Sequence, residues 1–211
     1  MCPGPPAVAV GDDADAVSAA ARLLAQGGVV VYPTETLYGL GADALNPAGL
    51  QRIVNLKVRQ PGKAIAVLIS DLAMLDDIVR DIPPVAQVLM RRFWPGPLTL
   101  VLPARPTLSE ILTGGSGGIG VRISSHPIAT ALVRELGRPV TAPSANPGGQ
   151  LPPACIEDAR RYFGAQVDGY LDGGRLPGEP ASTVVDVCGA PRVIRSGAIS
   201  ADDLHAVLGA T

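Results

Sequence analysis

Aromatic residues are scarce in this chain: Phe, Trp and Tyr make up 3% of its 211 residues, and Trp occurs once. Base stacking on aromatic side chains therefore cannot be the main way in which the chain holds nucleic acid. The formal net charge is −2 at pH 7. That balance excludes a global positive field that would attract nucleic acid or an anionic membrane.

Residues that bind metals or form disulfides are also few. The three cysteines, Cys2, Cys155 and Cys188, are odd in number and form no CxxC pair, which excludes a disulfide framework. The histidines are His126 and His205, so we expect neither a zinc site nor a Ser/His/Asp triad. We expect Cys155 and Cys188 to contribute only packing and His126 to start a helix. This cysteine usage indicates a reducing compartment.

Long apolar runs of the membrane-spanning kind are missing. The longest run without a charged residue covers residues 139–156 and contains five prolines, which a membrane helix would not tolerate. The first thirteen residues have neither the basic start nor the long apolar segment of a secretory signal. We therefore expect a cytoplasmic protein that does not contact the membrane.

The chain does contain enough apolar residues to fold. Hydrophobic residues make up 47% and charged residues 17%, which excludes intrinsic disorder. A length of 211 residues suits one domain with a sizeable core. The sequence shows no internal repeat and no linker, so we expect residues 1–211 to form a single domain.

Capping and turn residues divide the chain into alternating strands and helices. Asn46-Pro47 is a typical helix start, and Pro84, Pro127 and Ser200 open further helices. Apolar runs predict strands at residues 8–10, 29–32, 64–69, 98–102, 119–123, 140–142, 183–187 and 192–195. This alternation predicts the α/β class, with helices around one twisted mixed sheet.

The two lysines stand out because the chain otherwise prefers arginine. It has 15 Arg, but its only lysines, Lys57 and Lys63, flank Arg59 in one seven-residue window. Lysine is a compact and mobile charge that suits phosphate groups. Either this window binds phosphate, or it is a solvated helix end with a chance pair of lysines.

Two short polar motifs directly follow predicted strands, where α/β sheets usually bind ligands. Residues 33–36, Pro-Thr-Glu-Thr, offer two hydroxyls and a carboxylate to a small polar substrate. Residues 143–147, Pro-Ser-Ala-Asn-Pro, place the Ser144 hydroxyl and the Asn146 amide between prolines that restrict the backbone. The alternative for each motif is an ordinary turn.

A charge inside an apolar strand marks a third candidate. Arg122 lies in the run Ile-Gly-Val-Arg-Ile, so it must be paired, face a cleft or alternate onto a solvent face. No acidic residue is near it in sequence, and a free guanidinium in a cleft would suit a carboxylate.

The Gly-x-Gly-x-x-Gly pattern at residues 115–120 precedes a strand, so we expect a loop at residues 114–118 and no dinucleotide site. These cations and hydroxyls suit phosphoryl or nucleotidyl transfer, which depends on positioning and charge stabilisation.

Taken in order, six groups of residues resemble the YrdC/Sua5 family, the threonylcarbamoyl-AMP synthases. They are YPTETLYGLG, LKVRQPGK, FWPGPLTLVLP, VRISSHP, APSAN, and STVVD with IRSG, and the resemblance extends from about residue 16 to residue 199. The family fold has a concave ligand cleft. Since the chain ends soon after these motifs, it resembles the short bacterial form of the family. A sister group, resembling YciO, lacks the clean PTE and SxN motifs that this chain has.

The resemblance implies a specific reaction. L-Threonine, bicarbonate or CO2, and ATP would give threonylcarbamoyl-AMP and pyrophosphate, which would make the chain a nucleotidyltransferase. Mg2+ would arrive with ATP, without a dedicated protein cage. Other proteins would use the product for the t6A modification of tRNA at adenosine 37. The alternative, from a different class, is a non-catalytic member of the superfamily that binds RNA.

The resemblance also implies roles for individual residues. The residues that would bind L-threonine are Thr36, Arg122, Ala142 and Ser182. The residues that would bind ATP are Lys57, Arg59, Lys63, Ser144, Asn146 and Arg195. Lys57 and Arg59 match the family's KxR motif and would act in catalysis by holding the phosphates. The chain departs from the family pattern at Leu68, where the long form often has a His that touches threonine, and at Gly118 and Pro152. These departures concern substrate affinity more than the reaction.

Overall fold

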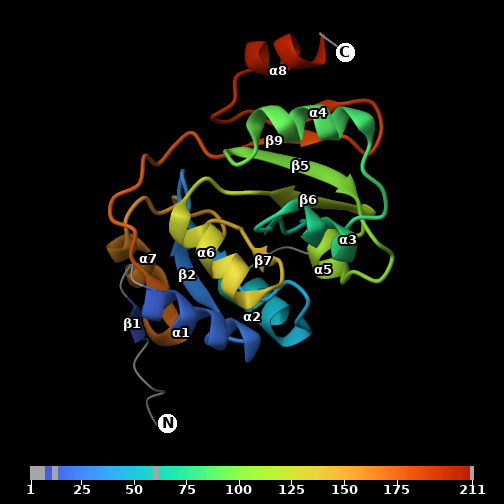
Figure 1. Cartoon of the computed structure of the whole chain (residues 1–211). Helices are drawn as coiled ribbons and strands as arrows, with labels where there is room; N and C mark the ends of the chain where they lie inside the picture. Colours follow the sequence, from blue (N-terminus) through green and yellow to red (C-terminus); the bar gives the residue numbers. More distant parts are fainter. Residues whose placement is uncertain (1–7, 11–13, 59–61, 210–211) are drawn as a thin grey trace.

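The strands form two sheets in the computed structural model of the chain, which describes residues 8–10, 14–58 and 62–209 (Figure 1). One sheet has four strands in the order β1-β8-β2-β3, and the other has six in the order β10-β9-β5-β6-β4-β7. Both sheets mix parallel and antiparallel pairs. The strands are β1 (Val8–Val10), β2 (Val30–Pro33), β3 (Tyr38–Gly41), β4 (Val67–Leu68), β5 (Leu98–Pro103), β6 (Gly118–Arg122), β7 (Val140–Thr141), β8 (Gly169–Leu171), β9 (Thr183–Asp186) and β10 (Arg192–Arg195).

The predicted mixed α/β class is confirmed, but the single sheet that we expected is divided in two. Residues 139–145 connect the two sheets. On one side of this segment, β7 pairs antiparallel with β4 of the six-stranded sheet. On the other side the segment runs along β3, through isolated bridges between Asp43 and Val140 and between Gly39 and Ser144. The two sheets are therefore joined at their edges.

Capping residues begin the helices where the sequence predicts. The side chains of Asn46, His126 and Ser200 each accept a hydrogen bond from a backbone N–H of the helix that follows, which satisfies donors left over at a helix start. The helices are α1 (Ala14–Ala25), α2 (Pro47–Lys57), α3 (Leu75–Ile78), α4 (Pro84–Phe93), α5 (Glu110–Thr113), α6 (Pro127–Leu136), α7 (Ile156–Phe163) and α8 (Ala201–Leu208). Within the described ranges, no helix has the length and apolar character needed to cross a membrane.

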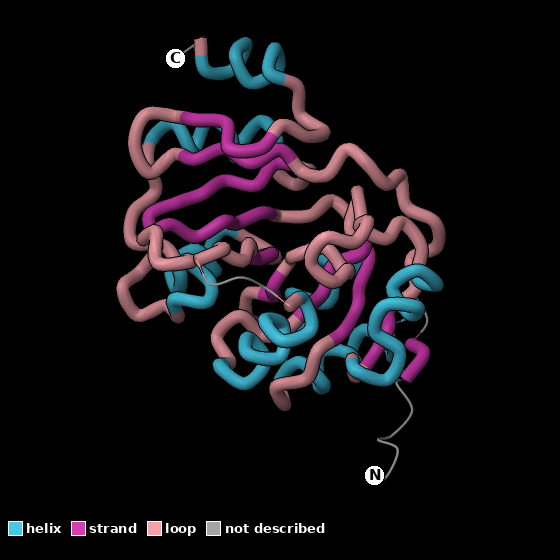
Figure 2. The backbone as a smooth tube through the Cα atoms, turned by 180° about the vertical axis from the view of Figure 1, so that it is seen from behind, coloured by secondary structure: helices cyan, strands magenta, loops and turns pink. Residues whose placement is uncertain are grey.

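Helices cover the outer face of each sheet. Helices α1 and α6 pack together and enclose an apolar cluster with Val30 and Tyr32 of β2. The opposite face of this region, including Val29 and Val31, belongs to a larger apolar cluster that extends to α2, α4 and β5. Helix α4 lies on the six-stranded sheet, and α8 lies on α4 (Figure 1). In Figure 2 the strands of the six-stranded sheet and their connecting loops face the viewer.

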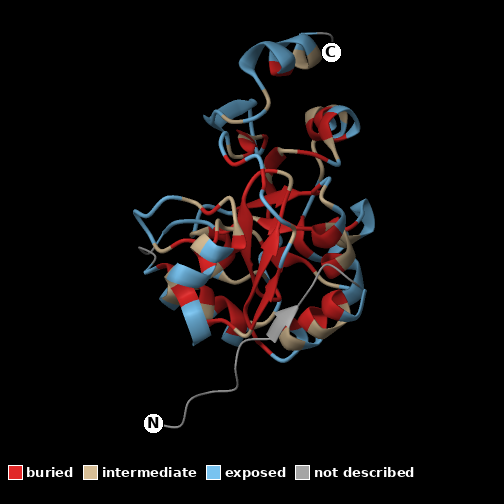
Figure 3. Cartoon of the chain, turned by 90° about the vertical axis from the view of Figure 1, so that its left-hand side faces the viewer, coloured by how far each residue is buried: buried red, intermediate tan, exposed pale blue. Residues whose placement is uncertain are grey.

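Burial follows these layers. Figure 3 shows buried strands in the middle of the molecule and exposed residues on the outer sides of the helices. Strand β10 is different, because all four of its residues are exposed. Strand β2 is buried throughout, because an apolar cluster covers each of its two faces.

Two strands were not predicted, and three are shorter than predicted: β4 by four residues, and β7 and β9 by one residue each. Strand β3 reads Tyr-Gly-Leu-Gly, and its glycines suggest a turn. They are needed because the Tyr32 ring lies against them: a Cβ at Gly39 would lie 3.0 Å from the ring Cζ, and one at Gly41 would lie 2.9 Å from Cε1. Strand β8, of three residues, is the other unpredicted strand. The strand expected at residues 64–69 is reduced to β4, because the Ile65 amide bonds to Leu112 outside the sheet.

Thr141 fastens the junction between the two sheets. It is fully buried, and its hydroxyl accepts a hydrogen bond from the Ala42 amide and donates to the Leu40 carbonyl, each at 2.9 Å. The Thr141 amide donates to the Ala42 carbonyl at 2.9 Å, and the Tyr32 hydroxyl donates to the Thr141 carbonyl at 2.9 Å. Burial raises the pKa of Tyr32, so this hydroxyl stays protonated and remains a donor.

We expect Thr141→Val to lower the free energy of unfolding by about 2–4 kcal/mol, because it leaves a buried donor and a buried acceptor unpaired. Urea denaturation followed by circular dichroism measures the change. Thr141→Ser keeps the hydroxyl and should lose only about 1 kcal/mol, for one buried methyl group. Equal losses in the two variants would show that the hydroxyl does not fasten the sheets.

Candidate active-site cleft

A cleft of about 520 Å³ opens on one face of the six-stranded sheet. Its floor consists of alternate residues of the strands, because successive side chains of a strand point to opposite faces. These floor residues are Ala66, Thr99, Val101, Gly118, Gly120, Arg122, Val184 and Asp186. The loop between β2 and β3, the segment after β7 and strand β10 form the walls. The concave cleft that we expected is confirmed.

Two glycines in the floor leave space in the cleft that side chains would otherwise fill. Gly118 and Gly120 present no side chain to the cleft, while Ile119 and Val121 between and beyond them point into the core. A Cβ at Gly118 would lie 2.7 Å from Cγ1 of Val101, so a larger residue would disturb the floor. We expected Gly118 in a loop, but it is the first residue of β6.

The Pro-Thr-Glu-Thr motif forms the loop of the hairpin between β2 and β3. Thr34 closes this loop, because its hydroxyl donates to the Leu37 carbonyl at 2.7 Å. The hydroxyls of Thr34 and Thr36 lie 3.2 Å apart, and both residues line the cleft. The motif is therefore a turn whose two threonines line the cleft.

Lys57 connects the basic window to the second motif. It lies at the C-terminal end of α2, lines the cleft and is 6% exposed. Its ammonium donates to the carbonyl oxygens of Ser144 at 2.5 Å and Asn146 at 2.7 Å. The structure thus brings together two motifs that lie 87 residues apart. The alternative of a solvated helix end is wrong for Lys57, because the ammonium is a buried anchor for the segment around Ser144.

The side chain of Asn146 is held firmly but has one unused atom. Its amide nitrogen donates to the carbonyls of Pro147 at 3.0 Å and Gln150 at 2.6 Å, which fixes the orientation of the amide. Its Oδ1 is buried and has no hydrogen-bond partner among the described residues. A buried acceptor without a donor costs about 1–3 kcal/mol. Asn146 is not one of the lining residues, so this atom lies behind the surface of the cleft.

Arg122 lies in the floor of the cleft, but it is not the free guanidinium that we expected. Its Nη1 donates to Oε1 of Glu35 at 2.9 Å, and the two side chains are 7% and 14% exposed. The alternative of a solvent-facing arginine is wrong. Glu35 and Arg122 lie 87 residues apart, so no local sequence pattern shows that they pair.

Arg195 of β10 folds over Ser182. Its Nη2 donates to the Ser182 carbonyl at 2.7 Å and to the Ser182 hydroxyl at 2.9 Å. The Ser182 hydroxyl in turn lies 3.0 Å from that of Thr99, a cleft residue that the sequence analysis did not identify. Burial lowers the pKa of Arg195, and the positive charge of Arg122 lowers it further. Both arginines line the cleft, and this end of it is therefore positive.

The remaining predicted positions differ in where they lie. Ala142 and Pro152 line the cleft. Lys63 is exposed and is not one of the lining residues, and Arg59 lies outside the described residues. Leu68 is buried in the cluster between α1, α6 and β2 and is not one of the lining residues. The strand register places it beside Arg122, on the same face of the sheet.

Cations outnumber acids along the cleft, although the whole chain is negative. The charged residues in the described lining are Lys57, Arg122, Arg192, Arg195 and Asp186. Four basic groups and one acidic group give the lining a formal charge of +3, which attracts polyanions. Among the described residues, no group of three or more His, Cys, Asp or Glu could hold a metal ion.

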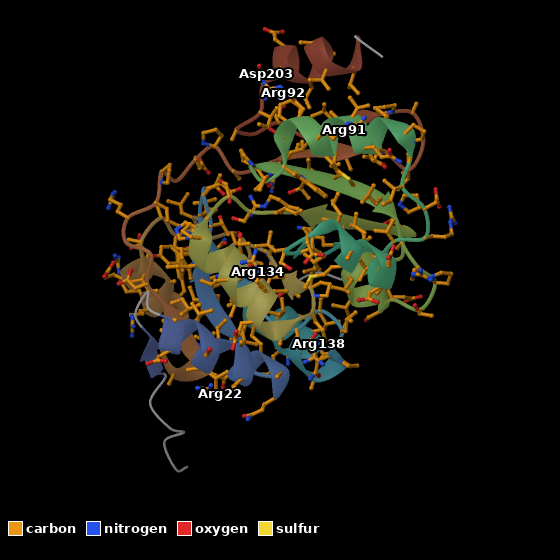
Figure 4. The ribbon with its side chains drawn as sticks, viewed as in Figure 1. Arg22, Arg91, Arg92, Arg134, Arg138 and Asp203 are labelled. Carbon is orange, nitrogen blue, oxygen red and sulfur yellow. The ribbon has the colours of Figure 1, made fainter. Side chains whose placement is uncertain are left out.

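Other arginines lie on the helices instead of in the cleft. Arg22 on α1, Arg91 on α4 and Arg134 on α6 are labelled in Figure 4, and none of them lines the cleft. Arg138 follows α6 and pairs with Asp43 at 3.0 Å. The positive charge of the cleft is therefore built from its own strands and from α2.

Comparison with known proteins identifies relatives over most of the chain. A family model, Sua5_yciO_yrdC, described as telomere recombination, matches residues 22–197. The threonylcarbamoyl-AMP synthase of Bacillus subtilis is 39% identical over 195 residues, which cover 92% of this chain and 56% of that protein. A putative threonylcarbamoyl-AMP synthase of Mycobacterium tuberculosis is 39% identical over 184 residues, which cover 87% of this chain and 84% of that protein.

A solved structure agrees with these relatives. The crystal structure of Pyrococcus abyssi Sua5 complexed with L-threonine matches with a TM-score of 0.92 and 33% identity. The match covers 96% of this chain and 61% of that one. The chain thus spans little more than half the length of the Bacillus subtilis and Pyrococcus abyssi proteins.

We expect Lys57→Met to lower the free energy of unfolding by about 2 kcal/mol, because the carbonyls of Ser144 and Asn146 lose a charged donor. Removal of a solvated lysine, in contrast, would leave the free energy of unfolding nearly unchanged. Chemical denaturation measures the loss. Lys63→Met is the matched control, since Lys63 is exposed, and it should change stability by less than about 0.5 kcal/mol. Equal midpoints for both variants would contradict the anchoring role of Lys57.

Proposed function

The chain belongs to the Sua5/YciO/YrdC family, and from this membership we propose that it makes threonylcarbamoyl-AMP and pyrophosphate from L-threonine, bicarbonate or CO2, and ATP. The observation that carries the proposal is the 39% identity of this chain to a threonylcarbamoyl-AMP synthase and to a putative one, over 92% and 87% of this chain. The positive cleft supports it, because the substrates carry a carboxylate and a triphosphate.

The end of the cleft around Arg122 suits an amino acid. The Pyrococcus abyssi structure contains L-threonine, and we assign the corresponding substrate of this chain to Thr36, Arg122 and Ser182, with the backbone near Ala142. The guanidinium would pair with the carboxylate. The two hydroxyls would bond the amine and the hydroxyl of the substrate, since a hydroxyl can both donate and accept.

The opposite side of the cleft suits the nucleotide. Lys57 and Ser144 line the cleft there, and the Lys57 ammonium bonds to the carbonyls of Ser144 and Asn146. Asn146 lies behind this surface and remains a predicted nucleotide contact. Arg195 bonds to Ser182, so we place it between the two substrates, where it would meet the α-phosphate. Arg59 and Lys63 remain predicted phosphate contacts.

The chemistry would proceed in two steps. The amine of threonine adds to CO2 and releases a proton, which forms a carbamate. A carbamate oxygen then attacks the α-phosphorus of ATP, and the bond to pyrophosphate breaks. The cations of the cleft would stabilise the charge on the phosphates as that bond breaks. Mg2+ bound to the phosphates of ATP would add to this stabilisation, since the described residues offer it no carboxylate cluster.

The product would serve the modification of tRNA. Other proteins would transfer its threonylcarbamoyl group to adenosine 37, which places the reaction in the cytoplasm. The alternative, a non-catalytic RNA-binding protein, is less well supported, because the relatives cited above are named as synthases. RNA binding that falls steeply with salt, without turnover of ATP, would favour that alternative.

We expect the purified protein to release pyrophosphate from ATP only when L-threonine and bicarbonate are both present. A coupled pyrophosphate assay measures this, and mass spectrometry identifies threonylcarbamoyl-AMP. Because hydroxyls line the amino-acid site, L-serine should be a poor substrate, and L-valine or 2-aminobutyrate should be worse. Equal pyrophosphate release without threonine or without bicarbonate would overturn the proposed function.

We expect Arg122→Gln to weaken the binding of L-threonine by roughly tenfold to a hundredfold, the value of a lost hydrogen bond between charged groups. The affinity for ATP should change less than about twofold, because the nucleotide lies on the other side of the cleft. Glutamine is too short to reach Glu35, so circular dichroism should first confirm that the variant is folded. Isothermal titration with each ligand separates the two effects. If threonine binding survives and ATP binding is lost, the two substrates are assigned to the wrong sides.

A further inference from the structure

Glu35 uses both of its carboxylate oxygens inside the protein. Oε1 accepts from Nη1 of Arg122 at 2.9 Å, and Oε2 accepts a short hydrogen bond from the hydroxyl of Ser124. Thr34 and Thr36, its neighbours on each side, line the cleft, whereas Glu35 is not one of the lining residues. The carboxylate therefore lies behind the cleft surface and contacts one of its cations from the rear.

Ser124, which binds this carboxylate, is itself held in place by hydrogen bonds to the start of α6. Its hydroxyl accepts from the His126 amide at 3.1 Å, and its carbonyl accepts from the Thr130 hydroxyl at 2.9 Å. Both partners belong to the beginning of α6. Glu35 thus connects the loop between β2 and β3 to the point where β6 leads into α6. The loop that carries Thr36 and the strand that carries Arg122 are joined by one side chain.

The charges make this connection necessary. Arg122 is largely buried, and a buried cation without a partner is costly. Arg195 is close enough for the charge of Arg122 to lower its pKa, so it opposes Arg122 instead of compensating it. Among the described residues, the acid that forms an ion pair with Arg122 is Glu35. The carboxylate also limits the directions that the guanidinium can take, because the charged hydrogen bond holds Nη1 toward Glu35.

We propose that Glu35 is a positioning residue, which holds Arg122 through Nη1 so that the rest of the guanidinium meets the carboxylate of the amino acid substrate. This inference rests on the proposed function, because it concerns the amino acid side of the same cleft. Glu35 acts by its shape and reach, through the simultaneous bonds to Arg122 and Ser124. It is not the base that accepts a proton from the substrate, because both of its oxygens are engaged away from the cleft.

Three substitutions of Glu35 distinguish the effect of its side-chain length from the effect of its charge. Glu35→Gln keeps the length of the side chain: its oxygen can still accept from Arg122, and its nitrogen can donate to Ser124, whose hydroxyl also accepts. Glu35→Asp keeps the charge but is shorter by one methylene group, so it cannot bridge both partners. Glu35→Ala removes both properties. Glu110→Gln is the matched control, because Glu110 is exposed at the start of α5 and does not line the cleft.

The experiment is isothermal titration of each full-length variant with L-threonine and with ATP, together with KM and kcat from pyrophosphate release. We expect Glu35→Asp and Glu35→Ala to weaken threonine binding by roughly tenfold to a hundredfold, as for a lost charged hydrogen bond. Glu35→Gln should weaken it less than about fivefold, because a neutral acceptor is weaker but remains in place. ATP affinity should stay within about twofold in all variants, and Glu110→Gln should match the wild type.

The reverse order would overturn the inference. If Glu35→Asp resembles the wild type and Glu35→Gln is the weak variant, the residue only compensates charge. Unchanged threonine affinity in all three variants, or parallel losses of threonine and ATP binding, would also overturn it. A wild-type protein that binds threonine without releasing pyrophosphate would overturn the proposed function alone. A wild-type protein that binds no threonine would overturn both.

Discussion

The cleft depends on how residues 139–146 are hydrogen-bonded. This segment pairs with β4 on one side and with β3 on the other, so it determines the separation between the two sheets. Thr141 secures the segment near its start with its hydroxyl and its backbone, and Lys57 secures it near its end through two carbonyls. A shift of this segment would move Ser144 and Asn146 relative to the floor of the six-stranded sheet. The stability of the junction and the geometry of the site therefore depend on the same hydrogen bonds.

A second constraint is that Lys57, Arg122 and Arg195 are each held by the protein before any ligand arrives. Carbonyl oxygens hold Lys57, a carboxylate holds Arg122, and the carbonyl and hydroxyl of Ser182 hold Arg195. Side chains held in this way lose little conformational entropy when they meet a substrate. Carbonyls and hydroxyls orient Lys57 and Arg195 without cancelling their charge. The cleft therefore stays positive in a protein whose net charge is −2.

The sequence predicts the local features of this fold well and the distant pairings poorly. Helix starts such as Asn46-Pro47 follow from capping chemistry, which depends on adjacent residues. The two polar motifs lie at strand ends and reach the cleft as expected, because strand ends are recognisable from apolar runs. The pair Glu35–Arg122 could not be predicted, since a partner 87 residues away leaves no local signal. The division into two sheets was missed for the same reason: strand order depends on long-range pairing.

The burial of Lys57 offers a physical reason for the rare lysines in an arginine-rich chain. Its ammonium fits between two carbonyl oxygens at 2.5 Å and 2.7 Å, a space that suits a compact group with donors in several directions. A planar guanidinium is wider and presents its donors in one plane, so it would separate the two carbonyls. Lys63 is exposed, so this argument concerns Lys57 only. The lysine at position 57 is thus explained by the backbone it holds, even before any phosphate is considered.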